Sequence, residues 1–336
     1  MLYLSTQSDR NVFTAHKTLC SDYASDGGYY VPFRFPVYSA SELASMRELS
    51  FNEIVANIIN LFFSARLTVW DVDFCIGRNV CRIFTMNHRI AVAELWHNPG
   101  SAYSYVVEKI YNKICKSDEC LKYPTNWARI AIGIAVQFAV YIEMLRAGVL
   151  EDGQVYDVSV EIEDFTNLIA SFYAKKMGLP IDTFICIQKG SGSVWDLIQR
   201  GIYSISENDV TVAAGVERLI YCTLGMEQAI HFSRLAQSGR TYTIDEDSIP
   251  QFNSSLFCSV AGAGRADTII NSIYRSNSYI IDPSAAICYG GVQDFRAKIG
   301  DSRLTLILSQ DAPVNTGSQI KVSTGLTDDT CRSATN

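Results

Sequence analysis

The longest apolar stretch of the chain, "ARIAIGIAVQFAVYIEML" from Ala128 to Leu145, restricts the fold more than any other feature. Arg129, Gln137 and Glu143 interrupt it, so it falls short of the roughly 20 apolar residues of a membrane-spanning helix. A helix that is apolar on nearly every side must be covered by other elements on several sides. The stretch therefore predicts a central helix buried in a large core.

The second half of the chain alternates between short strands and helices. The segments "GQVYDVSVEI", "DTFICIQ" and "RLTLILSQ" read as strands, and helical patterns such as Asp164 to Met177 separate them. Earlier, "CRIFTMNHRIAVAELWH" predicts paired strands, and Tyr103 to Cys115 an amphipathic helix. Alternating strands and helices are typical of a mostly parallel sheet that helices cover. The expected fold class is α/β.

Composition excludes several classes of function. Of 336 residues, 48% are hydrophobic and 19% are charged, as in an ordinary globular protein. A net charge of -7 without any Lys/Arg-rich run argues against nucleic acid and against an anionic membrane as partners. The ten cysteines form no C-x-x-C pair and have no histidine at zinc-finger spacing, so we expect neither a metal site nor disulfides. This pattern, and an N-terminus without a secretory signal, favour a cytoplasmic protein.

Four sequence blocks carry a resemblance to a known family. "DGGYYVP", "ELWHNPGSAYSYV", "YAKKMGLPIDTFICIQ" and "DPSAAICYGG" occur in an order that resembles threonine synthases, which are fold-type II enzymes that use pyridoxal phosphate. The resemblance covers Leu2 to about Leu308. It implies a threonine synthase-like N-terminal domain at 1–95 and a degenerate α/β domain of the pyridoxal phosphate enzymes at 96–322. We expect a disordered tail at 323–336.

The first departure from the family removes its catalytic lysine. Where this chain reads "ELWHNPGSAYSYV", threonine synthases read approximately Glu-Leu-Phe-His-Gly-Pro-Thr-Leu-Ala-Phe-Lys-Asp-Phe, and the lysine forms a Schiff base with the cofactor. Glu94, His97, Pro99 and Ala102 match, and the lysine falls on Ser104. Because serine has no amine, the resemblance implies that the Schiff base cannot form.

Two further departures concern the phosphate and the substrate. The family's glycine-rich phosphate loop corresponds here to "EIEDFTN", which brings in Glu161, Glu163 and Asp164. Carboxylates repel a phosphate, and Cβ atoms hinder close approach of the backbone. The family's small lobe, with its Ser-Gly-Asp-Thr-Gly motif, has no counterpart between Ser104 and Asn126. The resemblance therefore implies a reduced small lobe and a chain that takes no cofactor.

One turn has a second interpretation. Lys189, Gly190, Ser191, Gly192 and Ser193 lie between a predicted strand and a predicted helix. A glycine-rich turn of this kind presents backbone N–H groups at a helix N-terminus, which suits an anion. It matches neither the dinucleotide fingerprint nor the P-loop spacing. A tight, capped turn without a ligand is the plainer interpretation.

Two groups of ionisable residues have similar alternatives. Glu94 and His97 are spaced as an acid–base pair, or His97 is a packing histidine kept from an ancestor. Glu161, Glu163 and Asp164 offer oxygen ligands to a divalent cation, or they form a solvated acidic loop.

The leading hypothesis is a catalytically inactive threonine synthase homologue that acts by binding a protein partner or a small ligand. The expected partner is a related subunit, in a homo- or hetero-oligomer. Two alternatives stay open. One is an enzyme with residual or altered pyridoxal phosphate-dependent carbon–oxygen lyase activity, through another lysine or through the turn at Gly190. The other is a sensor of amino acids or phosphorylated ligands that uses the old cleft.

Overall fold

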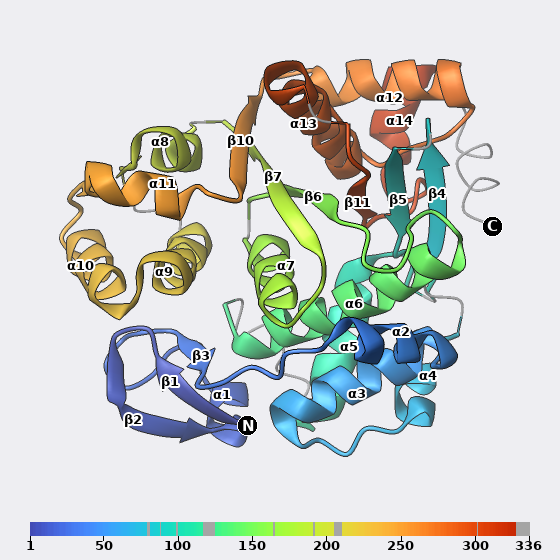
Figure 1. The fold of residues 1–336 in the computed structure, drawn as a ribbon. Coiled ribbons are helices and arrows are strands. Elements are labelled where there is room, and N and C mark those ends of the chain that lie inside the picture. The colour runs from blue at the N-terminus through green and yellow to red at the C-terminus, as the bar shows by residue number, and fades with distance from the viewer. Residues whose placement is uncertain are drawn as a thin grey trace.

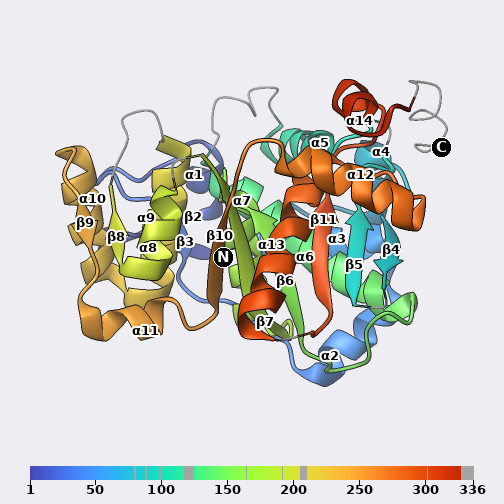
Figure 2. The same ribbon diagram turned by 90° about the horizontal axis from the view of Figure 1, so that it is seen from above.

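A six-stranded sheet forms the centre of the molecule (Figure 1). The computed structural model describes residues 1–78, 81–87, 89–98, 100–116, 125–163, 165–190, 192–204, 210–300 and 302–326. The strand order is β10-β7-β6-β11-β5-β4, and Figure 2 shows the six strands side by side in this order. They are β4 (Arg82–Met86), β5 (Ile90–Glu94), β6 (Tyr156–Glu161), β7 (Ile181–Lys189), β10 (Leu256–Ala261) and β11 (Thr305–Ser309).

The sheet is parallel except at one edge, which confirms the expected α/β class. β10, β7, β6, β11 and β5 pair in parallel, while β4 and β5 form the predicted antiparallel pair. Because parallel strands end at the same edge, Glu94, Glu161, Lys189 and Ser309 lie along one edge of the sheet. Binding sites of open α/β sheets lie outside this edge.

Helix α6 (Trp127–Arg146) is the predicted central helix. It is long and apolar enough to cross a membrane, but 89% of its most apolar window is buried inside the protein. It packs against α3 (Phe51–Phe63), α5 (Tyr103–Cys115) and α7 (Thr166–Lys176). A Cβ at Gly133 would lie 2.8 Å from the Cβ of Ala170, so glycine allows the close approach of α6 and α7. The helix is therefore a core element.

The other face of the sheet is covered by α13 (Pro283–Ile299), which packs on β6, β7, β10 and β11. Outside it lie α12 (Arg265–Asn277) and α14 (Gly317–Thr324), as Figure 2 shows. Helices on both faces explain why the five parallel strands are largely buried, whereas the edge strand β4 is mostly half-buried or exposed.

The N-terminal region contains a small sheet and a set of capped helices. β2 (Ser8–Thr14), β1 (Leu2–Ser5) and β3 (Tyr30–Pro32) form an antiparallel sheet, followed along the chain by α2 (Ala40–Ser45), the 3-10 helix η1 (Met46–Glu48), α3 and α4 (Val69–Ile76). Helix α1 (Ala15–Leu19) lies between β2 and β3 in sequence. Reciprocal hydrogen bonds between the N-cap residue and the third helical residue begin α2, α3 and α4.

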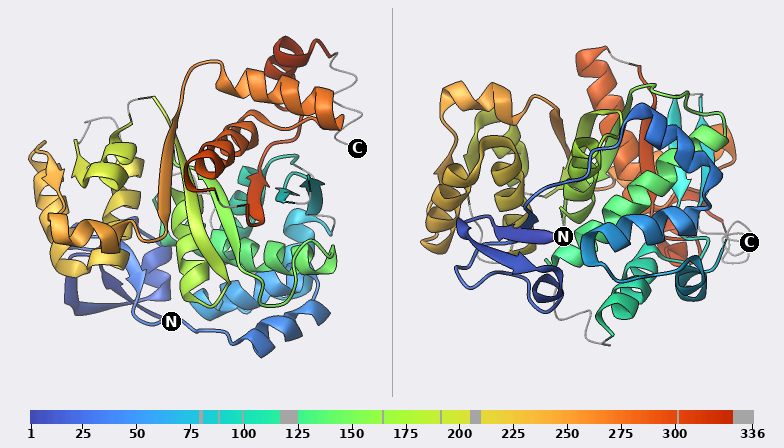
Figure 3. Two further views of the ribbon diagram at one scale, coloured as in Figure 1. Left: turned by 45° about the horizontal axis from the view of Figure 1, so that its top comes forward. Right: turned by 60° about the horizontal axis from the view of Figure 1, so that its bottom comes forward.

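A group of small elements flanks β10 (Figure 3). It consists of α8 (Ser193–Arg200), α9 (Val210–Leu224), α10 (Met226–Gln237), α11 (Ile249–Phe252), the 3-10 helix η3 (Glu246–Ser248) and the strand pair β8 (Ile202–Tyr203) and β9 (Tyr242–Thr243). The N-terminal sheet is joined to this group through buried polar side chains. Thr6 donates a hydrogen bond to Glu217 of α9, and Gln7 donates to Ser233 of α10 at 2.7 Å. These contacts connect the N-terminal sheet to helices that lie more than 200 residues later in the chain.

Candidate functional site

An open pocket of about 210 Å³ lies at the carboxyl ends of β6 and β11. Its lining includes Ser159, Glu161, Glu163, Asn167, Ser284 and Gln310. These residues come from β6, the first turn of α7, the start of α13 and the segment after β11. Pockets for drug-sized ligands occupy about 300–1,000 Å³, so this one suits a small metabolite.

Lys189 lies between the two carboxylates of this pocket. Its Nζ forms an ion pair with Glu161 and lies 3.7 Å from Oε1 of Glu163. Ser284 donates a hydrogen bond to the other oxygen of Glu161. Burial favours a lower pKa for Lys189, but the hydrogen bond and the charge of Glu161 outweigh it, and the pKa lies above its ordinary value. The lysine from the predicted turn and the acidic segment therefore form one site.

The turn after β7 is capped by a neighbouring side chain. Oε1 of Gln188 accepts hydrogen bonds from the backbone N–H groups of Val194 and Trp195, at 2.9 and 3.1 Å. Gly192, the N-cap residue of α8, has a φ of 76°. Because Gln188 already occupies these donors, the geometry supports the capped turn rather than an anion site. Ser191 lies outside the described residues.

Position 104 directly follows a residue that is hydrogen-bonded to the pocket lining. Ser104 is in the first turn of α5, and its side chain is exposed. The N–H of Tyr103 donates to the carbonyl of Gln310 at 2.7 Å, and Gln310 lines the pocket. Lys109, farther along α5, lies 5.1 Å from the ring centre of Tyr105. A hydroxyl therefore stands at the sequence position where the resembling family has an amine, one residue from the contact between Tyr103 and Gln310.

Glu94 and His97 are brought together outside the pocket lining. Nε2 of His97 lies 2.6 Å from one oxygen of Glu94, and the hydroxyl of Tyr279 donates to the other at 2.9 Å. The ring of Trp96 stacks on His97 with 4.0 Å between centroids. Since both carboxylate oxygens have partners, this arrangement supports the packing interpretation of His97.

Asp282 is a buried carboxylate that the sequence reasoning did not single out. It accepts hydrogen bonds from the hydroxyl of Ser309 and, as the N-cap of α13, from the N–H of Ala285. Burial raises its pKa to about 6, although both hydrogen bonds oppose the rise. Asp282 begins the block "DPSAAICYGG" and immediately precedes a proline, which is an N-cap signal.

The described part of the acidic segment shows no arrangement for a metal ion. Among the described residues, no group of three or more His, Cys, Asp or Glu side chains is placed to hold one. Asp164, the third carboxylate of the segment, lies outside the described residues, as does Pro99. The described carboxylates Glu161 and Glu163 share Lys189 instead.

Part of the chain is similar in sequence to known proteins. The sequence model of the family "Threonine synthase N terminus" matches residues 2–79. Threonine synthase-like 1 of Homo sapiens is 25% identical over 175 residues, which are 48% of this chain and 23% of that protein. Threonine synthase of Saccharomyces cerevisiae is 22% identical over 209 residues, which are 54% and 40% of the two chains. This chain thus spans about a quarter of the length of the threonine synthase-like 1 relatives that it matches.

Solved structures share the fold over nearly the whole chain. The pyridoxal phosphate-bound threonine synthase from Brucella melitensis aligns with a TM-score of 0.82 and 18% identity, covering 97% of this chain and 92% of that one. Threonine synthase from yeast aligns with a TM-score of 0.81 and 16% identity, over 96% and 89%. This chain is threonine synthase-like. The resemblance stated from the sequence blocks is confirmed, and so is the α/β architecture.

The expectation that this threonine synthase-like chain takes no cofactor is contradicted. Its fold matches that of a threonine synthase that was solved with pyridoxal phosphate bound. The expected repulsion of a phosphate treated the charges of Glu161 and Glu163 as unpaired. Lys189 pairs with both, and the pocket that they help to line is open.

Proposed function

We propose that this chain is a catalytically inactive threonine synthase homologue that binds pyridoxal phosphate reversibly, without covalent attachment. The observation that carries the proposal is the open pocket at the strand ends, whose lining residue Gln310 accepts a hydrogen bond from Tyr103, the neighbour of Ser104. The threonine synthase-like fold supports the identity of the ligand. The chain would act through the bound state rather than through turnover.

The residues of the pocket fit such a ligand, apart from the missing anchor. Asn167 lies in the first turn of α7, a helix whose N-cap residue, Phe165, contributes no side-chain cap. The N-terminal end of α7 and the ammonium of Lys189 would face the phosphate. The hydroxyl of Ser284 would face the polar edge of the ring. Glu161 and Glu163 leave the described cluster with one net negative charge, so we expect binding weaker than in an enzyme.

The missing amine explains why catalysis should be absent. When bound in an enzyme, pyridoxal phosphate supplies an electron-accepting ring to a substrate that it holds covalently. Ser104 cannot supply or exchange the amine that such a sequence needs. Among the described lysines, Lys189 lies beside the pocket, but its ion pair and raised pKa keep it protonated and a poor nucleophile. The lyase alternative therefore gains no support from Lys189.

Equilibrium dialysis of the purified protein against pyridoxal phosphate tests the proposal. We expect saturable binding that dialysis reverses, and no stoichiometric lysine adduct after borohydride reduction. Asn167→Leu, which replaces a polar group of the pocket lining with an apolar one, should weaken binding, whereas Asn11→Leu on the exposed face of β2 should leave it unchanged. A stoichiometric adduct on a native lysine would support the residual enzyme instead, and absence of binding would refute the proposed ligand.

A further inference from the structure

A second pocket, of about 340 Å³, lies between the start of α3 and helix α4. Phe51 and Asn52 of α3 line one side, and Trp70 and Asp73 of α4 line the other, with Arg78 following α4. The proposed pyridoxal phosphate site uses none of these residues. This pocket is therefore separate from the proposed pyridoxal phosphate site.

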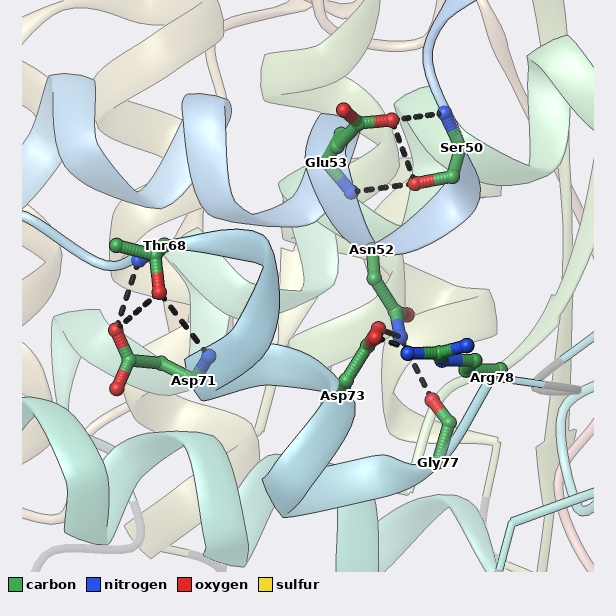
Figure 4. Close-up of polar contacts among 8 residues, drawn as sticks. All are labelled: Ser50, Asn52, Glu53, Thr68, Asp71, Asp73, Gly77 and Arg78. Carbon is green, nitrogen blue, oxygen red and sulfur yellow. Dashed lines mark hydrogen bonds and ion pairs between the residues drawn. The ribbon is translucent and has the colours of Figure 1, made fainter.

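Asn52 fixes the orientation of the carboxylate in this pocket. Its buried amide donates to Oδ1 of Asp73 at 2.7 Å and to the carbonyl of Gly77 at 2.6 Å (Figure 4). Oδ2 of Asp73 remains for a cation. Asp73 also lies in the last turn of α4, where the helix dipole favours positive charge. The carboxylate is thus held ready for a cationic group.

The contacts of Arg78 indicate that a guanidinium suits this pocket. Its Nε lies 2.9 Å from Oδ2 of Asp73, and its Cζ lies 5.5 Å from the ring centre of Trp70. A guanidinium suits this combination, because it forms directed hydrogen bonds to a carboxylate and stacks on an aromatic face. Yet the Arg78 side chain is 70% exposed, and Trp70 also stays 70% exposed. Arg78 therefore covers the site loosely.

Phe74 extends the same surface with an apolar group. It lies one helical turn beyond Trp70 on α4, and it is 89% exposed. Exposed aromatic side chains next to a charged rim are characteristic of protein interfaces. A small cation would use Asp73 and Trp70 but would leave Phe74 without a contact.

We propose that this surface, made of Asn52, Trp70, Asp73 and Phe74, is a docking site for an arginine side chain of a partner protein. The partner's guanidinium replaces that of Arg78 between Asp73 and Trp70. An apolar residue next to the partner's arginine covers Phe74. Charge complementarity to Asp73 and the fit already made by Arg78 carry the assignment.

The chain contains a matched control on α8. The guanidinium of Arg200 lies 5.2 Å from the ring centre of Trp195 and pairs with Asp196 at 3.1 Å. The carboxylate there is more open, since the side chain of Asp196 is 39% exposed and that of Asp73 is 17% exposed. If every surface group of Arg, Trp and Asp bound arginine, the groups around Trp70 and Trp195 would both bind it.

Fluorine NMR of protein labelled with 5-fluorotryptophan separates the two places, because the chain has only four tryptophans. Titration with N-acetyl-arginine amide should shift the Trp70 signal with a dissociation constant on the order of 1–10 mM, as expected for a few weak contacts. The Trp195 signal should stay in place. N-acetyl-citrulline amide, which is neutral, should shift neither signal. Parallel shifts of Trp70 and Trp195, or equal effects of the two compounds, would overturn the proposal.

Three variants test whether the added arginine displaces Arg78 from Asp73. Arg78→Ala removes the internal competitor and should tighten binding by about three- to tenfold, whereas Arg200→Ala should leave it unchanged. Asp73→Asn should abolish the shift. Because Asp73→Asn also disturbs the bond from Asn52, the gain from Arg78→Ala is the decisive result. Unchanged or weaker binding by that variant contradicts the displacement.

A second ligand distinguishes a protein partner from a free cation. N-acetyl-Arg-Leu amide should bind at least about fivefold more tightly than N-acetyl-arginine amide, since the leucine covers Phe74. Phe74→Ala should remove that gain and leave the affinity for the single amino acid unchanged. Equal affinity for the two ligands would assign the site to a small cation and overturn the protein partner.

Discussion

Replacement of Asp282 by asparagine tests how a buried carboxylate at the start of α13 governs stability. Burial gives this group a folded-state pKa of about 6, against 3.8 in an unperturbed aspartate. The folded protein therefore holds a proton on Asp282 more tightly than the unfolded chain does. The associated stability is fully present below pH 3.8 and is lost as the pH rises through 6.

The size of the effect follows from the two pKa values. Their difference, at about 1.36 kcal/mol per pH unit, corresponds to about 3 kcal/mol of unfolding free energy. About 2 kcal/mol of this falls between pH 4.5 and neutrality. Asparagine cannot ionise, and it is a good N-cap residue that can still accept the N–H of Ala285. Asp282→Asn should therefore gain about 2 kcal/mol relative to the wild type between about pH 4.5 and about pH 7.5.

Urea unfolding followed by circular dichroism, at several pH values in this range, measures the difference directly. Ser309→Ala serves as a second variant, because the Ser309 hydroxyl lowers the pKa of Asp282. Its removal should move the loss of stability to higher pH. A stability difference between wild type and Asp282→Asn that is the same at every pH would refute the reasoning.

Other predictions concern packing, helix capping and binding of pyridoxal phosphate. Gly291→Ala should cost about 1–3 kcal/mol of unfolding free energy, because its Cβ would lie 2.2 Å from the buried Ile187. Gly262→Ala should cost little, because the space around Gly262 is open. Equal urea midpoints for the two variants would contradict this prediction. Gln188→Ala should cost about 1–2 kcal/mol and speed hydrogen exchange at Val194, whose N–H it caps; unchanged exchange there would count against the cap. Lys189→Met should weaken binding of pyridoxal phosphate, as measured by dialysis, because the carboxylates of the pocket lose their cation.

Local patterns in the sequence were sufficient to predict much of the fold. The apolar run of α6 predicted a helix covered on all sides, because burial requires apolar residues on every face. The amphipathic period of Tyr103–Cys115 gave the limits of α5. The alternation of strands and helices from β6 onward predicted a parallel sheet.

The contacts that build the pocket could not be predicted in this way. Lys189 meets Glu161 only because β6 and β7 are neighbours in a register that pairs Glu161 with Ile187. Strand order and register depend on packing across the whole sheet, which a single sequence does not display. The same limitation explains why the acidic segment was interpreted as repelling phosphate, and why Gln188 was not recognised as the cap of α8.

The site beside Ser104 was located by resemblance and not by pattern. The hydrogen bond from Tyr103 to Gln310 then showed that the start of α5 contacts the pocket lining. Asp282 and Ser284 lay in one of the resembling blocks, yet their partners Ser309 and Glu161 are distant in sequence. Long-range polar contacts of this kind need the folded structure.

Peptide mapping of Ser104→Lys, after incubation with pyridoxal phosphate and borohydride reduction, tests most directly whether the pocket binds this cofactor. We expect a stoichiometric adduct on the new lysine, because it restores the amine of the resembling family next to a pocket that binds the ligand. Ser238→Lys, on an exposed turn after α10, should give no such adduct. If residue 104 remained unmodified, or reacted no more than residue 238, the pocket would not be a pyridoxal phosphate site.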